Sequence, residues 1–195
     1  MSTNDESKLD KAIRGIGLIL GEVKTPEHRG PTMNFYQAKG GQLQFSVAPP
    51  KYRPTERSRP EDSGIAWASK MGAVFIEAAP PIPNSDPPRL DWANSKMVFA
   101  MSDKDIGEIL WGFSVKSPEI RLIHAPDEKQ RENCKTFRLK REKDYNGSPQ
   151  WSISLTEKKN GKETRVSLFI KGPDVMRLKT LLEGALPYIM GAHKT

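Results

Sequence analysis

Cysteine is almost absent from this 195-residue chain, which has a single one, Cys134. One cysteine cannot form a disulfide within the chain, so a disulfide-stapled scaffold is excluded. Cys134 lies in a strand-like run, 134–139, with no histidine nearby to help it bind a metal or to lower its pKa. We therefore interpret it as a half-buried structural cysteine and not as a catalytic thiol.

Long apolar runs are also missing, since none approaches the ~20 residues that a membrane-spanning helix requires. The opening residues, 1–7, are acidic and resemble neither a secretory signal nor an arginine-rich transit peptide. We expect a cytoplasmic protein in a reducing compartment, with no membrane among its partners.

The usual components of an active site are scarce. The three histidines lie far apart, and we find no phosphate-cradling loop, metal-ligand cluster or nucleophile motif. Asp86 with Asp91, or Asp103 with Asp105, could pair for metal-assisted cleavage, but the second pair follows Ser102 and is better explained by helix capping. We predict that the chain is not an enzyme and needs no catalytic residue, metal, cofactor or small-molecule substrate.

Basic residues are what the chain has in excess: 31 lysines and arginines against 24 acids give a net charge of +7 and a pI near 9.5. This balance favours contact with phosphate backbones or anionic surfaces, although a solvated basic surface would give the same composition. The length and the 36% apolar content fit one folded domain with mobile ends.

The first half reads as a leader followed by four strands and a helix. Residues 1–31 form the expected leader, with a short helix over 7–20 that two glycines weaken. Strands are predicted at 33–37, 43–47, 71–79 and 96–101, with a hairpin turn at 38–41 and a long proline-broken loop after residue 48. Ser102 is placed to cap a helix whose apolar stripe includes Ile106, Ile109, Leu110 and Phe113.

The second half repeats this order without visible sequence identity. The predicted strands are 120–124, 134–141, 151–156 and 164–170, and the Asn-Gly pairs at 146–147 and 160–161 are typical hairpin turns. A second helix starts at Pro173, and Pro187 and Gly191 end its pattern. The prediction is an α+β fold of two β-β-β-β-α units, with two antiparallel four-stranded sheets and helices packed between or behind them. The domain covers 32–191, and 192–195 is a tail.

Several segments together resemble the Whirly proteins, and they follow that family's order and spacing over nearly the whole chain. These segments are Gly72–Pro80, Asp91–Trp92, Phe99–Ser102, Ile106–Gly107, His124–Pro126 and Leu186–Gly191. The resemblance implies the doubled fold, tetramers packed through their helices, single-stranded DNA lying across the outward sheets, and no cofactor. Because the plant members' transit peptide is absent, we expect a bacterial cell or a phage that infects one.

Binding of single strands requires a basic track for phosphates and flat side chains on which bases stack. Trp151 shares its strand parity with Ile153 and Leu155, which favours a place in the core, and Trp92 also has a structural interpretation. Arg138 and Lys140 should share the outward face of their strand. The predicted contacts are Lys39, Gln42, Gln44, Ser46, Lys51, Tyr52, Arg53, Trp67, Lys70, Arg89, Trp92, Lys96, Arg138 and Lys140.

The sequence therefore predicts a single-stranded DNA-binding protein with little sequence specificity, which protects or presents DNA in replication, recombination, repair or transcription. Two alternatives stay open at this point. One is an RNA-binding or annealing protein of the same fold, and the other is a scaffold whose sheets bind another protein.

Overall fold

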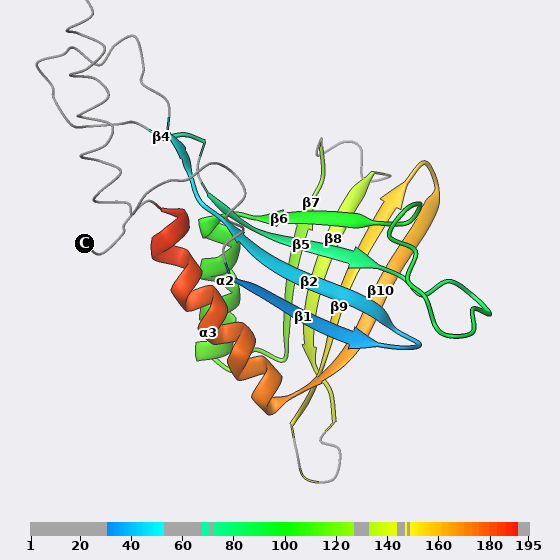
Figure 1. Ribbon diagram of the computed structural model, residues 1–195. Coiled ribbons are helices and arrows are strands. Elements are labelled where there is room, and N and C mark those ends of the chain that lie inside the picture. Colours follow the sequence, from blue (N-terminus) through cyan, green and yellow to red (C-terminus); the bar gives the residue numbers. More distant parts are fainter. Residues whose placement is uncertain are drawn as a thin grey trace, which may run out of the picture.

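The computed structural model describes residues 31–52, 68–70, 72–126, 133–143, 147 and 149–190 (Figure 1). For 51–52 and 68–70 it describes the backbone alone. The predicted leader helix at 7–20 and the tail at 192–195 lie outside the described residues. None of the helices among the described residues has both the length and the apolarity that crossing a bilayer requires.

The first sheet contains strands β1 (Thr32–Gln37), β2 (Gly41–Ala48), β5 (Ala73–Ala79) and β6 (Met97–Met101), in the spatial order β1-β2-β5-β6. All neighbours are antiparallel. The turn between β1 and β2 ends at Gly41, whose φ of 97° is a conformation that glycine adopts without strain. The predicted hairpin and the two later strands are therefore confirmed.

A short feature of the first half differs from the prediction. The segment after residue 48 was expected to be all loop, but β3 (Lys51–Tyr52) pairs antiparallel with β4 (Ala68–Lys70) in a small two-stranded sheet. Four prolines, at 49, 50, 54 and 60, interrupt the alternation that indicates a strand, so the sequence gives no signal for such a short pairing.

The second sheet contains β7 (Glu119–His124), β8 (Cys134–Arg141), β9 (Gln150–Lys159) and β10 (Lys162–Lys171). Its order is β10-β9-β8-β7, and every pair is antiparallel. The four predicted strands are confirmed, and the last two are longer than predicted because charged residues continue the pairing beyond the apolar positions.

Helix α2 (Asp103–Ser114) follows the first sheet and begins with a capping box. The Ser102 hydroxyl accepts a hydrogen bond from the Asp105 backbone N–H, and the Asp105 carboxylate accepts one from the Ser102 N–H at 2.8 Å. Gly112 lets the helix approach β7, since a Cβ at that position would lie 2.5 Å from Ile120 Cγ1.

Helix α3 (Gly172–Ile189) follows the second sheet and corrects one prediction. The helix does not end at Pro187 but continues through it to Ile189. Proline lacks the backbone N–H that would donate to the preceding turn. So close to the end of the helix, only one hydrogen bond is lost. The buried Ile189 side chain and a hydrogen bond from the Gly72 N–H to the Ile189 carbonyl at 3.1 Å hold the last turn in place.

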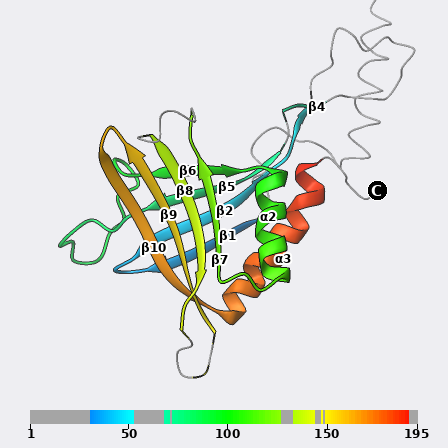
Figure 2. The same ribbon diagram turned by 180° about the vertical axis from the view of Figure 1, so that it is seen from behind.

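The core lies between the two sheets, which cross each other with α2 and α3 side by side at one end (Figures 1 and 2). Phe45 of the first sheet and Phe137 of the second meet edge to face, with ring centroids 6.3 Å apart. Trp151 packs against Phe113 and is buried, as its strand parity predicted. Since the inner faces meet in the core, the outer faces of the two sheets point away from each other.

Candidate nucleic-acid interface

The middle of the second sheet's outer face is flat and rich in hydroxyl groups. Cross-strand register places Arg138 beside Ser154 and Ser154 beside Ser167, while Thr136 lies beside Thr156 in the next row. The alternate residues on these strands point into the core, which fixes the orientation of the hydroxyls. Thr136, Thr156 and Ser167 are partly exposed and can donate and accept hydrogen bonds, whereas Ser154 between them is buried, with 4% of its surface exposed.

Two arginines lie at opposite margins of this face. Arg121 belongs to the edge strand β7 and Arg165 to the other edge strand, β10. Both are exposed, and neither makes a hydrogen bond or an ion pair within the part of the chain that the structure describes. Their guanidinium groups are therefore available to an anion such as a phosphate.

Two large apolar side chains share the outer face with the arginines. Phe169 on β10 is 53% exposed, and Ile123 on β7 is 54% exposed. The Gln37 side chain holds the Phe169 backbone: its Nε2 donates to the Phe169 carbonyl at 2.6 Å, and its Oε1 accepts from the Phe169 N–H at 3.2 Å. An exposed ring on a fixed backbone is suitable for stacking against an unpaired base.

Arg138 and Lys140 lie on this face as predicted, but each already has an acidic partner. Arg138 Nη2 lies 2.7 Å from Glu119 Oε2, and Lys140 Nζ lies 3.1 Å from Glu142 Oε2. The hydrogen bond from Arg138 holds the pKa of Glu119 below its usual value. Hydrogen bonds from Ser152 and then Lys140 do the same for the pKa of Glu142.

The first sheet's outer face has a different chemistry. Gln42, Gln44 and Ser46 point outward from β2, and register places Asn34 beside Gln44. Lys96 does not stand free as predicted, because its Nζ forms an ion pair with Glu77 Oε1 at 2.6 Å. This face consequently presents amides and a tyrosine, Tyr36, which is 53% exposed, with little net charge.

The structure thus divides the predicted contacts between two faces and several loops. Lys39 is exposed in the β1–β2 turn, Arg89 is exposed in the 80–96 connection, and Trp92 is partly buried there. The side chains of Lys51, Tyr52 and Lys70, and the whole of Arg53 and Trp67, lie outside the described residues.

Sequence reasoning missed Arg121, Ile123, Arg165 and Phe169. The sequence does indicate their outward placement, because each occupies a strand position that alternates with the buried residues of the same strand. Phe169, for example, lies between Leu168 and Ile170, both of which are in the core.

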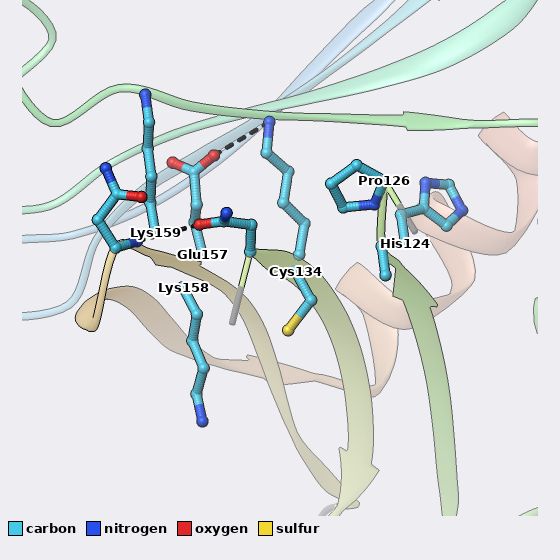
Figure 3. A pocket seen from close by; sticks show the side chains of 10 residues that line it. His124, Pro126, Cys134, Glu157, Lys158 and Lys159 are labelled. Atoms are coloured by element: carbon cyan, nitrogen blue, oxygen red, sulfur yellow. Dashed lines mark hydrogen bonds and ion pairs between the residues drawn. The ribbon is translucent and has the colours of Figure 1, made fainter. Parts of the chain in front are cut away.

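A depression of about 450 Å³ lies at the end of the second sheet (Figure 3). Its lining includes Cys134, Lys135, Glu157, Lys158 and Lys159, and Lys158 and Lys159 point to opposite sides of β9 in Figure 3. The Glu157 carboxylate is paired with Lys135 at 3.1 Å. Over the described residues, no group of three or more His, Cys, Asp or Glu is arranged to hold a metal ion. The depression is lined mainly by cationic and polar side chains.

His124, also in that lining, joins the two halves of the molecule. Its Nε2 lies 3.1 Å from Asp105 Oδ1 of α2, and its ring stacks on Phe99 of the first sheet with centroids 4.1 Å apart. Burial alone would raise the pKa of Asp105, but hydrogen bonds from Ser102 and His124 outweigh it and lower that pKa. These contacts give His124 a structural role at the end of β7.

A doubled four-strand-plus-helix unit with polar outward sheets defines a class of nucleic-acid-binding fold, and comparison with known proteins identifies the family. Residues 35–179 match the model of the Whirly transcription factor family. The match covers more than half of the chain, so the chain belongs to the Whirly family, which comprises single-stranded DNA-binding transcription regulators. The resemblance noted in the sequence is confirmed.

Solved structures support the same fold. The plant transcriptional regulator PBF-2 is similar with a TM-score of 0.66 and 20% identity, over 86% of this chain and 93% of that one. WHY1 from Arabidopsis thaliana gives a TM-score of 0.63 and 18% identity, over 85% and 94%. WHY3 from the same plant gives 0.63 and 19%, over 86% and 92%. No curated protein sequence matches the chain.

Proposed function

We propose that this protein binds single-stranded DNA with little sequence specificity, and that the second sheet's outer face is its principal contact. The observation that carries the proposal is the arrangement on that face. A hydroxyl-rich middle lies between two unpaired arginines, Arg121 and Arg165, with the exposed ring of Phe169 beside them.

Each component of that face suits one part of an unpaired strand. Guanidinium groups bind phosphate oxygens through charge-assisted hydrogen bonds, whatever the sequence. An aromatic ring stacks on any base, because every base has a π face. Hydroxyl groups can donate or accept and so tolerate different base edges. A duplex hides those base faces and edges, which favours single strands.

The first sheet's outer face supports a secondary role. Its amides, including Gln42 and Gln44, can hydrogen-bond to bases, but its ion-paired Lys96 adds little attraction for phosphate. The protein would use this binding to protect or present single strands in replication, recombination, repair or transcription. It acts without a metal, a cofactor or catalysis.

The test compares single-stranded DNA, single-stranded RNA and duplex DNA of equal length by fluorescence anisotropy over a range of salt concentrations. We expect the tightest binding to single-stranded DNA and a linear fall of log K with log salt. Tighter binding to RNA would favour the alternative of an RNA-binding protein. Weak and equal binding to all three would refute the proposal and leave the protein scaffold as the better interpretation.

We further propose that the protein is a homotetramer assembled through its helices. Large apolar side chains remain uncovered on both helices: Trp111 on α2 is 69% exposed and Met176 on α3 is 60% exposed. Gly107 lies one turn before Trp111, and a Cβ there would meet no atom within 4 Å. A second copy can therefore approach the α2 backbone closely and cover these side chains.

Light scattering coupled to gel filtration tests the assembly. The wild type should have the mass of four chains, and Trp111→Glu combined with Met176→Glu should give smaller species. Ile82→Glu is the matched control, because Ile82 is an exposed apolar residue in the 80–96 connection and not on a helix. A monomeric wild type would overturn the tetramer and leave the DNA-binding proposal standing.

A further inference from the structure

Two carboxylates lie within the basic end of the second sheet's outer face. Glu119 begins β7 and lies opposite Lys140 of β8, and Glu142 follows directly after β8. Glu142 is held in place: its backbone N–H donates to the Gln150 carbonyl at 2.9 Å, and its Oε1 accepts from the Ser152 hydroxyl at 2.8 Å. We name Glu119, Arg138, Lys140 and Glu142 the charge cluster.

The charge cluster neutralises the cations that sequence reasoning assigned to phosphate. Arg138 is bonded to Glu119 and Lys140 to Glu142, so each positive charge has a negative one beside it. These side chains are between 29% and 40% exposed, which lets water or another ion reach them. By contrast, neither Arg121 nor Arg165 makes a hydrogen bond or an ion pair among the described residues, although the charge of Arg121 also contributes to lowering the pKa of Glu119.

Arg138 keeps one hydrogen-bonding site unused. Its Nε atom is buried and has no hydrogen-bond partner among the described residues. The inward-facing Lys135 differs, because its Nζ bonds both Glu157 and the Val98 carbonyl, at 2.8 Å for the latter. A phosphate has several acceptor oxygens and can satisfy both Nε and Nη2 of one arginine, which a single Glu119 oxygen does not do.

We propose that Glu119 and Glu142 are internal competitors of the DNA phosphates, an inference that rests on the proposed function. A bound strand contacts Arg121 and Arg165 directly but gains Arg138 and Lys140 only by displacing the two carboxylates. The carboxylates thereby weaken binding, reduce its salt dependence and favour release of the strand. Removing them exposes a larger basic face without adding any new cation.

The first test replaces both acids by their neutral isosteres, Glu119→Gln with Glu142→Gln. Affinity for a fluorescent single-stranded DNA should rise about threefold to tenfold, since surface ion pairs of this kind are individually weak. The slope of log K against log salt concentration, here called the salt slope, should become steeper by up to about 1.4, which corresponds to two more phosphate contacts on a single strand. The control, Asp86→Asn with Glu183→Gln, makes the same change in net charge away from the sheet.

The second test is a cycle with Arg138→Ala and Lys140→Ala. In the wild type these substitutions should change affinity little, whereas in the doubly Gln-substituted protein they should abolish the gain. Thermal unfolding of every variant shows whether the fold survives. The inference is overturned if the Gln variant binds like the charge-matched control, or if the two alanines weaken both backgrounds equally. A wild type that does not bind DNA would refute the proposed function as well, which distinguishes the two failures.

Discussion

The two outer faces of this molecule have the same backbone architecture, but the first carries little net charge and the second is basic. The first sheet presents amides, Tyr36 and one closed ion pair, while the second presents hydroxyls, Phe169 and several basic residues of which Arg121 and Arg165 are unpaired. The same fold therefore carries different chemistry on its two outer faces, because the outward positions of the strands hold different residues.

The largest effect should come from removing the free arginines of the second face. Arg121→Ala with Arg165→Ala should weaken binding to single-stranded DNA by about a hundredfold, because charge-assisted hydrogen bonds contribute roughly 1.5 kcal/mol or more each. Asn34→Ala with Gln44→Ala on the first face is the matched control and should have a much smaller effect. Anisotropy titrations measure both. Equal losses would show that both faces contribute equally to DNA binding.

A smaller effect is expected from the exposed rings. Phe169→Ala should weaken binding about tenfold at every salt concentration, since stacking on an aromatic residue contributes about 1–3 kcal/mol per base. The salt slope should stay unchanged, because no phosphate contact is lost. Tyr36→Ala provides the equivalent change on the first face. A Tyr36 effect larger than that of Phe169 would make the first sheet the main stacking surface.

The junction between the faces should affect stability and not binding. Asp105→Asn weakens the capping box and the contact with His124, and should reduce the free energy of unfolding by about 1 kcal/mol. Denaturant titration measures this loss, and anisotropy below the unfolding transition should give an unchanged affinity. A specific loss of affinity in the folded variant would mean that the junction takes part in binding.

The smallest effect concerns the acid dependence of stability on the second face. The Arg138 hydrogen bond lowers the pKa of Glu119 below its ordinary 4.5, so the folded state holds this proton less tightly than the unfolded state. The contribution is present above about pH 4.5 and is lost as the pH falls through the lowered value. Glu119→Gln should therefore make stability less dependent on pH as the pH falls below about 4.5, by less than about 1 kcal/mol. Identical acid unfolding profiles would contradict this.

Apolar patterns bounded by turn residues predicted all eight main strands: several alternate with a period of two because one face is buried, while β5 is a nearly continuous apolar run. The helix start at Ser102 was equally predictable from local capping chemistry. The ion pairs between strands could not be predicted in this way. Glu119 lies on β7 and Arg138 on β8, and only the folded register brings them together. The alternation of each strand shows that Phe169, Arg121 and Arg165 face outward. The net charge of the sequence, however, does not reveal which basic side chains lack an acidic partner in the fold.

Gln37 has a consequence for how these molecules behave at high concentration. The unpaired backbone N–H and C=O groups of an edge strand can pair with a strand of another molecule, which is a common route to aggregation. The Gln37 side-chain amide forms hydrogen bonds with both the N–H and the carbonyl of Phe169. These are the bonds that one residue of an added strand would make with β10. Uncontrolled lengthening of the second sheet past β10 is thereby blocked at that position, while the side chain of Phe169 stays free to face outward.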